Sequence, residues 1–393
     1  VDWQTSIKTS TITVVNGEGY FVNTTGGAIT ANLPAGSAGA IVSFRDYANT
    51  FDSNSLTVSP NGSEKINGLA IDLIVSTEGE SLTLVYADAT KGWLIVNDGN
   101  NDAGSQVEYV AATGGTITTV CTNFKVHTFT GPGTFTVTNA GNAAGSNTVD
   151  YMVVAGGGGG GSDGGGGAGG GYRESSGANS GGYTRSPLGA CVSALSVPAT
   201  AYPITVGGGG PGAPTSGNGT NGSNSIFSTI TSAGGGRGGD KSTPCKAGAN
   251  GGSGGGASRD AGGSGGAGSG NTPPVSPPQG NNGGAQPATS AADGAGGGGA
   301  GAVGSNGGSP GTDGGGPGAV GTPSDISSST VVRAGGGGGG TDSVNTPGGG
   351  GTGGSGGGGP GGKRCVAGGA GSANLGGGGG SGGTGAAGGQ GGS

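Results

Sequence analysis

The feature that most limits the fold of this chain is a succession of glycine runs that begins at Gly156 and recurs up to Ser393. Most of the 111 glycines lie in this region, and no Phe, Tyr or Trp follows Ala233. Such a region cannot fold by burying side chains, because it has almost none to bury. It is therefore either a flexible glycine linker or a structure in which the main chain itself packs.

Main-chain packing is the better prediction. Glycine chains in the polyproline II geometry make three residues per turn, rise about 3.1 Å per residue and form no internal hydrogen bonds. Because glycine has no Cβ, such chains can approach closely, hydrogen-bond to their neighbours and add Cα–H···O contacts. The length of the region, its regular interruptions and the strands that lead into it favour order. We predict a polyglycine II bundle over 156–393, with loops at both ends.

Residues 1–100 are predicted to form β-structure. Short runs of β-branched and aromatic residues recur every 8–12 residues or so, which suggests an antiparallel sandwich or meander. No helical periodicity is sustained, so the expected fold class is all-β N-terminal modules followed by a polyglycine II helix bundle, with essentially no α-helix. The turn signals between the runs are Asn16-Gly17, Asn61-Gly62, Asn67-Gly68, Glu78-Gly79 and Lys91-Gly92.

Residues 101–155 are expected to form a connector and part of a β frame. Phe124–Thr130 and Thr134–Thr138 flank Gly131-Pro132-Gly133, which predicts a hairpin. His127 lies in the middle of the first of these strands and is interpreted as a pairing or core residue. Further strands at 194–206 and 226–232 are predicted to complete the frame. The expected domains are therefore 1–100, 101–155 and 156–393.

Composition excludes several classes of protein. The net charge is −7 with 9% charged residues, so nucleic-acid binding is not expected. No apolar run is long enough to insert across a bilayer. The four cysteines and the single His do not form a zinc-site pattern, so no metal and no cofactor are expected. Cys245 and Cys365 lie in short interruptions where a disulfide is one alternative, and four free thiols are the other. Because the chain begins at Val1, we expect a fragment or a processed product.

The sequence contains segments that approach known catalytic motifs, but their surroundings lack the residues or elements that those motifs require. Gly357–Arg364 approaches a P-loop, but Arg364 stands where Ser or Thr is required. Gly251–Gly255 fits GxSxG, yet no strand, helix or His accompanies it. Cleavage of a polysaccharide would need two converging carboxylates, and the acidic residues here are scattered singly. We therefore predict that the chain is not an enzyme.

Two parts of the sequence resemble bacteriophage proteins. The segments GYFVNTTGGAITANLP (19–34), GAIVSFRDYANTFDSNSLTV (39–58), NGSEKING (61–68) and LTLVYADATKGWLI (82–95) resemble a small β module of tail fibres from T-even-like myoviruses, especially marine ones. The order HTFTGPGTFTV, DYMVVAGGGGGG, YPITVGGGG and NSIFSTITSAGGGRGG resembles the glycine-rich domain of phage tail-fibre tip adhesins. This resemblance implies a virion tail-fibre protein whose distal loops bind a host cell-surface protein or glycan. It also implies contact with other tail-fibre subunits and homo-oligomers, with a trimer as one form. A monomeric tip bundle is the alternative, because its hydrogen bonds can close within one chain.

Aromatic and arginine side chains dominate recognition energetics, and loops held on a rigid scaffold are common binding surfaces. The predicted receptor-binding residues are therefore the aromatic and basic residues of the interruptions: Tyr172, Arg173, Tyr183, Arg185, Lys241, Arg259, Lys363 and Arg364. The alternative interpretation is a secreted, self-assembling, extracellular glycine-rich filament or matrix protein. Ice binding is a third, which would require a flat Thr- and Ala-rich face.

Overall fold

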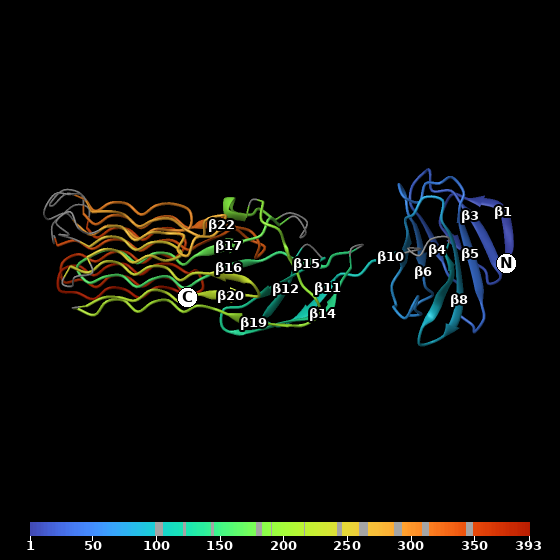
Figure 1. The fold of residues 1–393 in the computed structure, drawn as a ribbon, viewed down its shortest axis with the longest axis horizontal. Helices are drawn as coiled ribbons and strands as arrows, with labels where there is room; N and C mark the ends of the chain where they lie inside the picture. Colours follow the sequence, from blue (N-terminus) through green and yellow to red (C-terminus); the bar gives the residue numbers. More distant parts are fainter. Residues whose placement is uncertain are drawn as a thin grey trace. The chain divides into compact units, whose positions relative to one another are not determined.

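The computed structural model describes residues 1–98, 105–120, 123–142, 145–177, 183–189, 191–215, 217–241, 246–258, 266–286, 293–308, 314–342 and 349–393. The chain divides into two compact units (Figure 1). Unit 1 contains residues 1–110 and 140–147, and unit 2 contains residues 111–139 and 148–393. The expected connector, 101–155, is divided between them. Among the described residues, no helix is long and apolar enough to span a membrane.

Unit 1 contains two five-stranded sheets, with strand orders β1-β3-β5-β8-β9 and β10-β7-β6-β4-β2. Their strands are β1 (Asp2–Lys8), β2 (Ile12–Thr13), β3 (Glu18–Val22), β4 (Ile29–Asn32), β5 (Ile41–Asp46), β6 (Leu56–Ser59), β7 (Leu73–Val75), β8 (Ser81–Asp88), β9 (Gly92–Asp98) and β10 (Ser105–Gln106). Buried side chains from both sheets, including Phe44, Leu56, Leu84 and Trp93, form one hydrophobic core. The β-rich character of 1–100 is thus confirmed.

The expected antiparallel topology of this region is wrong for its first half. The chain alternates between the two sheets from β1 to β6, so that β1, β3 and β5 pair in parallel, as do β2, β4 and β6. Antiparallel pairing begins only with β6–β7, β5–β8 and β8–β9. The predicted turns are correct, because the glycines of all five signals have positive φ: Gly17, Gly62, Gly68, Gly79 and Gly92. Turn chemistry is local, whereas the choice between a hairpin and a crossover depends on distant partners.

Unit 2 combines short strands with the glycine runs. Its five-stranded frame sheet has the order β11-β14-β19-β20-β21, and the other strands pair two by two. The elements are β11 (Val110–Thr113), β12 (Thr116–Val120), β13 (Phe124–Thr128), β14 (Gly133–Ala140), β15 (Thr148–Val149), β16 (Met152–Val154), β17 (Tyr172–Glu174), the 3₁₀ turn η1 (Pro187–Gly189), β18 (Leu195–Ser196), β19 (Ala201–Thr205), β20 (Ser225–Phe227), β21 (Ile230–Ser232), β22 (Thr322–Ser324) and β23 (Val331–Arg333). That turn is the only helical element in the described ranges, as the fold class requires.

The predicted hairpin around Gly131-Pro132-Gly133 is wrong, although both strands exist. β14 has its two edges occupied by β11 and β19, so β13 pairs instead with β12. His127 pairs with Ile117, and its Nδ1 lies 2.8 Å from the carbonyl oxygen of Gly114. Its ring packs edge-to-face with that of Phe135, with the ring centroids 5.1 Å apart. This arrangement confirms the interpretation of His127 as a pairing and packing residue.

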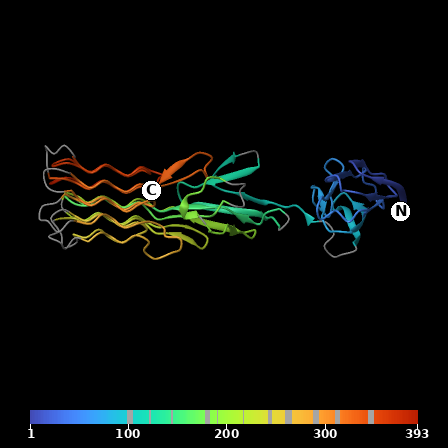
Figure 2. The same ribbon diagram turned by 90° about the horizontal axis from the view of Figure 1, so that it is seen from above.

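The glycine runs form a bundle of extended segments that lie side by side along one axis (Figures 1 and 2). In the segment Gly156–Gly161, successive N–H groups donate to three different neighbours, and every third donor returns to the same one. Gly156 and Gly159 donate to Ser223 and Thr220, at 3.1 and 2.9 Å. The pairs Gly157/Gly160 and Gly158/Gly161 reach the second and third neighbours in the same way. This threefold pattern, with all bonds leaving the segment, is that of polyglycine II.

The carbonyl groups of the same segment accept from three further neighbours, for example from Gly235 at 2.9 Å and Gly210 at 2.8 Å. The six neighbouring segments are 164–171, 207–213, 219–224, 233–240, 376–383 and 387–393. Glycine is required because the segments touch through their main chains. A Cβ added to Gly157 would lie 2.1 Å from the carbonyl oxygen of Gly377, which no side chain can tolerate. The order of the region thus comes from lateral hydrogen bonds of the main chain.

Prolines of the segments occur where a segment faces solvent, whereas buried positions other than glycine hold small residues such as Ala168 and Ser253. In 207–213, the buried positions recur every third residue, and Pro211 is exposed between them. Proline has no N–H to satisfy, so it suits an outward position. Asparagine has the complementary role. The side-chain oxygens of Asn250 and Asn282 accept the N–H groups of Ser269 and Gly270, both at 2.8 Å. Surface asparagines therefore replace the carbonyl groups that a further segment would supply.

Candidate functional site

The bundle has two chemically different ends. We call the end at which β16, β17 and β20–β23 lie the frame end, and the opposite end the far end (Figures 1 and 2). The first segment runs from β16 to Gly161, and the return segment runs from Gly164 to β17. The predicted receptor-binding residues are divided between these ends, and Arg259 lies outside the described residues.

Tyr172, Arg173, Tyr183 and Arg185 lie at the frame end. Tyr172 is 1% exposed, and its hydroxyl donates to Glu174 Oε2 at 3.1 Å. Burial raises the pKa of Tyr172, and the neighbouring Glu174 carboxylate raises it further. Burial also raises the pKa of Tyr183, whose hydroxyl donates to the Ser175 carbonyl oxygen at 3.3 Å.

These contacts have a structural role at the frame end. Glu174 also accepts the Ser324 hydroxyl and the N–H of Ser186, which ties β17 to β22 and to the turn before η1. The buried side chain of Tyr172 is not accessible to a partner, which contradicts its expected place in a loop. Arg173 is half-buried in β17, opposite Val153, and only Arg185 of this group is exposed.

Lys241, Lys363 and Arg364 lie at the far end. Lys241 follows the segment 233–240, and Lys363 and Arg364 form an exposed turn after Gly362. Two hydrogen bonds hold this turn: Val366 N–H to the Lys363 carbonyl oxygen at 2.8 Å, and Cys365 N–H to the Thr384 carbonyl oxygen at 2.9 Å. The structure therefore brings these three basic residues to one end of the bundle.

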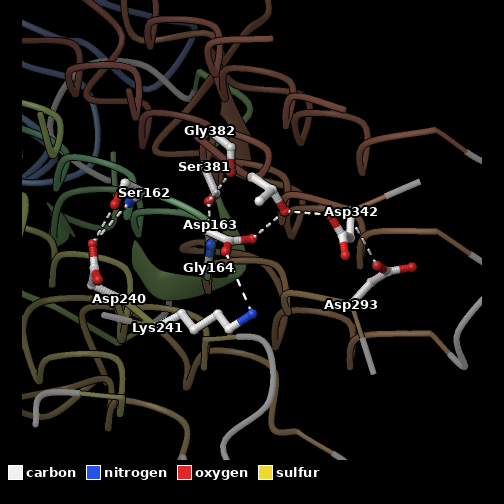
Figure 3. A network of polar contacts seen from close by, with 10 residues as sticks. Ser162, Asp163, Gly164, Asp240, Lys241, Asp293, Asp342, Ser381 and Gly382 are labelled. Atoms are coloured by element: carbon white, nitrogen blue, oxygen red, sulfur yellow. Dashed lines mark hydrogen bonds and ion pairs between the residues drawn. The ribbon is translucent and has the colours of Figure 1, made fainter. Parts of the chain in front are cut away.

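A network of small polar and acidic side chains underlies the far end (Figure 3). Ser162 donates from its hydroxyl to Asp240 Oδ2 at 2.6 Å, and both residues are buried. Ser381 accepts the N–H of Gly164 at 3.0 Å, and its hydroxyl lies 2.9 Å from the carbonyl oxygen of Gly161. These contacts satisfy main-chain groups at the first turn, where the lattice of segments ends.

The network continues through Asp163. Its Oδ2 lies 3.8 Å from Lys241 Nζ, and its Oδ1 lies 2.9 Å from the hydroxyl oxygen of Thr384. The same hydroxyl oxygen is 2.6 Å from Oδ1 of Asp342. Figure 3 shows Asp163 between Lys241 and a series of polar contacts that leads to Asp342 and then to Asp293. We call this network the far-end cap. Its Asp240 and Asp293 are buried, Asp163 is partly buried and Asp342 is exposed, while the basic turn 363–364 faces solvent.

The acidic members of this network were not among the predicted site residues. Each stands at the end of a glycine run, in Ser162-Asp163, Asp240-Lys241, Asp293-Gly294 and Thr341-Asp342. That position is a signal that could have found them, because a run must end where the lattice ends and its last main-chain groups need side-chain partners.

The cysteines add no cross-link within the described residues. Cys191 and Cys365 are exposed free thiols, and Cys365 belongs to the far-end turn. The alternative disulfide between Cys245 and Cys365 cannot be placed, since Cys245 lies outside the described residues.

A search of curated proteins finds no match. The model of a family described as a glycine-rich domain matches residues 128–393, which is more than half of the chain and includes the bundle and the frame strands β14, β19, β20 and β21. The strand-to-glycine junctions, the lateral hydrogen bonds and the far-end cap described above all lie within the matched residues. The chain belongs to the glycine-rich domain family.

Proposed function

We propose that this chain is a bacteriophage tail-fibre adhesin that binds a bacterial surface receptor through the far end of its bundle. The observation that carries the proposal is the exposed turn of Lys363 and Arg364 on a scaffold fixed by main-chain hydrogen bonds. Binding sites are commonly turns held on a rigid support. Recognition without catalysis, on a host surface protein or glycan, is the activity that suits such a site. An acidic group on the receptor would complement the two basic side chains.

The asparagine and proline residues on the bundle surface favour a discrete fibre tip over a polymer. Asn250 and Asn282 occupy the N–H groups that a neighbouring bundle would otherwise bind, and Pro211, Pro317 and Pro360 present none. Proteins limit edge-to-edge growth of sheets by comparable means. These features count against lateral growth into a filament, which is the alternative function. The proposed location is the virion tail fibre, where several copies and other fibre subunits would add avidity.

The test is adsorption of the purified, fluorescently labelled chain to a panel of bacterial isolates. The double substitution Lys363→Ser and Arg364→Ser should abolish binding to any isolate that the wild-type chain labels. Arg185→Ser is the matched control, because Arg185 is an exposed arginine at the frame end. Equal loss with both variants, or no loss with the first, would refute a receptor site at the far end. Continuous polymers of the purified chain in electron micrographs would favour the filament instead.

A further inference from the structure

Strand β1 forms an open and partly apolar edge of unit 1. It is the outermost strand of its sheet, and β3 is its only strand partner among the described residues (Figure 1). Large hydrophobic side chains are exposed on β1 or directly before it: Val1, Trp3 and Ile7, which are 51%, 40% and 37% exposed. The Trp3 ring lies on the outer face of the sheet, with its centroid 5.0 Å from that of Phe21. An open edge with exposed apolar side chains is a surface to which a further strand can pair.

The middle of β1 is not paired within its own sheet. The pairing with β3 is regular up to Gln4 and resumes only at Lys8, so Thr5–Ile7 have no partner on β3. These three residues are exposed. The chain nevertheless remains a strand up to Lys8, whose Nζ lies 5.8 Å from the centre of the Tyr20 ring. Gln4 is opposite the same tyrosine, so Gln4 and Lys8 face the same side and the alternation of side chains is retained across the bulge.

The sequence of β1, DWQTSIK, is chemically symmetric about its central residue, Thr5. When two copies are placed antiparallel with Thr5 opposite Thr5, Asp2 of each copy lies opposite Lys8 of the other. In the same register Trp3 lies opposite Ile7. Opposite charges and aromatic–β-branched pairs are cross-strand pairs that stabilise a sheet, and a two-fold axis makes each pair occur twice. A shift of one residue in either direction would lose both kinds of pair, so the side chains specify this register.

We propose that two copies of this chain associate through antiparallel pairing of their β1 strands about a two-fold axis at Thr5. The sheets β1-β3-β5-β8-β9 of the two copies would then form one continuous sheet. The pairing gives main-chain partners to Thr5–Ile7 and covers the exposed apolar side chains of the edge. A contact of one short strand from each copy is small, so the association is reversible and weak. It involves unit 1 and does not depend on the receptor site proposed for the far end.

Cysteine trapping in the full chain, with the four native cysteines replaced by Ser, tests the register. In the proposed pairing the two Thr5 Cα atoms lie about 4.5–5.5 Å apart, which a disulfide can bridge. Thr5→Cys should therefore give a disulfide-linked dimer under mild oxidation. Ser6→Cys is the matched control, because Ser6 is also exposed but lies opposite Gln4 of the second copy. The two Ser6 Cα atoms are then more than about 7 Å apart, so we expect at least about tenfold less dimer from this variant.

Charge exchange tests the same pairing by sedimentation velocity of the full chain under reducing conditions. Lys8→Asp places two acidic residues opposite each other at both ends of the contact, so it should weaken the dimer by at least about fivefold. Adding Asp2→Lys restores opposite charges and should recover most of the affinity. The proposal is overturned if the wild-type chain stays monomeric at about 1 mM, or if Thr5→Cys and Ser6→Cys give equal amounts of dimer. It is also overturned if the double variant dimerises no better than Lys8→Asp alone.

Discussion

The hydroxyl of Ser162 donates to Asp240 Oδ2 at 2.6 Å and joins two ends of glycine segments that are 78 residues apart in the sequence. The N–H of Ser162 points to the same oxygen at 3.3 Å. Asp240 is fully buried, so this contact is part of the interior of the far-end cap.

Replacing Asp240 by Ala should destabilise the cap. The substitution leaves two buried donors of Ser162 without their acceptor, which costs about 1–3 kcal/mol. We expect faster amide exchange in peptides that cover 156–171 and 233–240, measured by mass spectrometry. Asp240→Asn retains an oxygen acceptor and should have a smaller effect. Equal exchange in the Ala variant and the wild-type chain would contradict a role for this contact.

Replacing glycine by alanine should destabilise the protein at inner positions of the bundle and not at outer ones. Gly157→Ala places a Cβ against the main chain of Gly377, and such overpacking costs at least about 1–3 kcal/mol. Gly208→Ala meets no atom within 4 Å, so its stability should stay within about 1 kcal/mol of the wild-type value. Guanidinium unfolding of both variants, followed by circular dichroism, provides the comparison. Similar midpoints for the two variants would show that the segments are not packed as described.

The asparagines of the bundle surface should act as caps. Asn250→Ala removes the acceptor of the Ser269 N–H, which should cost about 1 kcal/mol. The local consequence is faster exchange of the Ser269 amide. The control is Asn374→Gly, since Asn374 is an exposed asparagine of a turn with a positive φ that glycine also adopts. An unchanged exchange rate at Ser269 in the Asn250 variant would rule out the capping role.

Unit 1 should lose stability in strong alkali through Tyr20. Burial, and then its hydrogen bond to Glu18, raise the pKa of Tyr20 from 10.0 to about 12. The folded state therefore holds the phenolic proton more tightly than the unfolded state does. The resulting stabilisation is complete below pH 10 and disappears as the pH rises from 10 to 12. Unfolding followed by tryptophan emission should show this loss, and Tyr20→Phe should reduce its pH dependence while lowering stability at neutral pH.

Much of this fold follows from residues that act locally. The glycine runs predict the bundle because only glycine allows the close approach seen at Gly157, and the Asn-Gly and Lys-Gly pairs predict turns at Gly17 and Gly92. β1 (Asp2–Lys8) and β4 (Ile29–Asn32) contain no continuous run of β-branched and aromatic residues, so that criterion does not find them. Their side chains are largely polar or small, and they become strands because neighbours far along the chain pair with them.

The candidate site was predictable only in part. Lys241, Lys363 and Arg364 were identified from charge in the interruptions, and their common position at the far end depends on the direction of each segment. The same criterion selected Tyr172, which is buried because Glu174, Ser324 and Ser186 form a network around it. The end of the bundle at which an interruption lies depends on the direction of the segments before and after it, and this direction is a property of the folded chain.

The three-residue repeat of donors in Gly156–Gly161 also restricts how such a chain can change in length. One residue inserted into or deleted from an inner run would rotate all the later amides of that run by a third of a turn, so that each would face the wrong neighbour. Three residues would restore the phase. Length variation among related bundles should therefore occur in multiples of three within the runs and in any number at the turns.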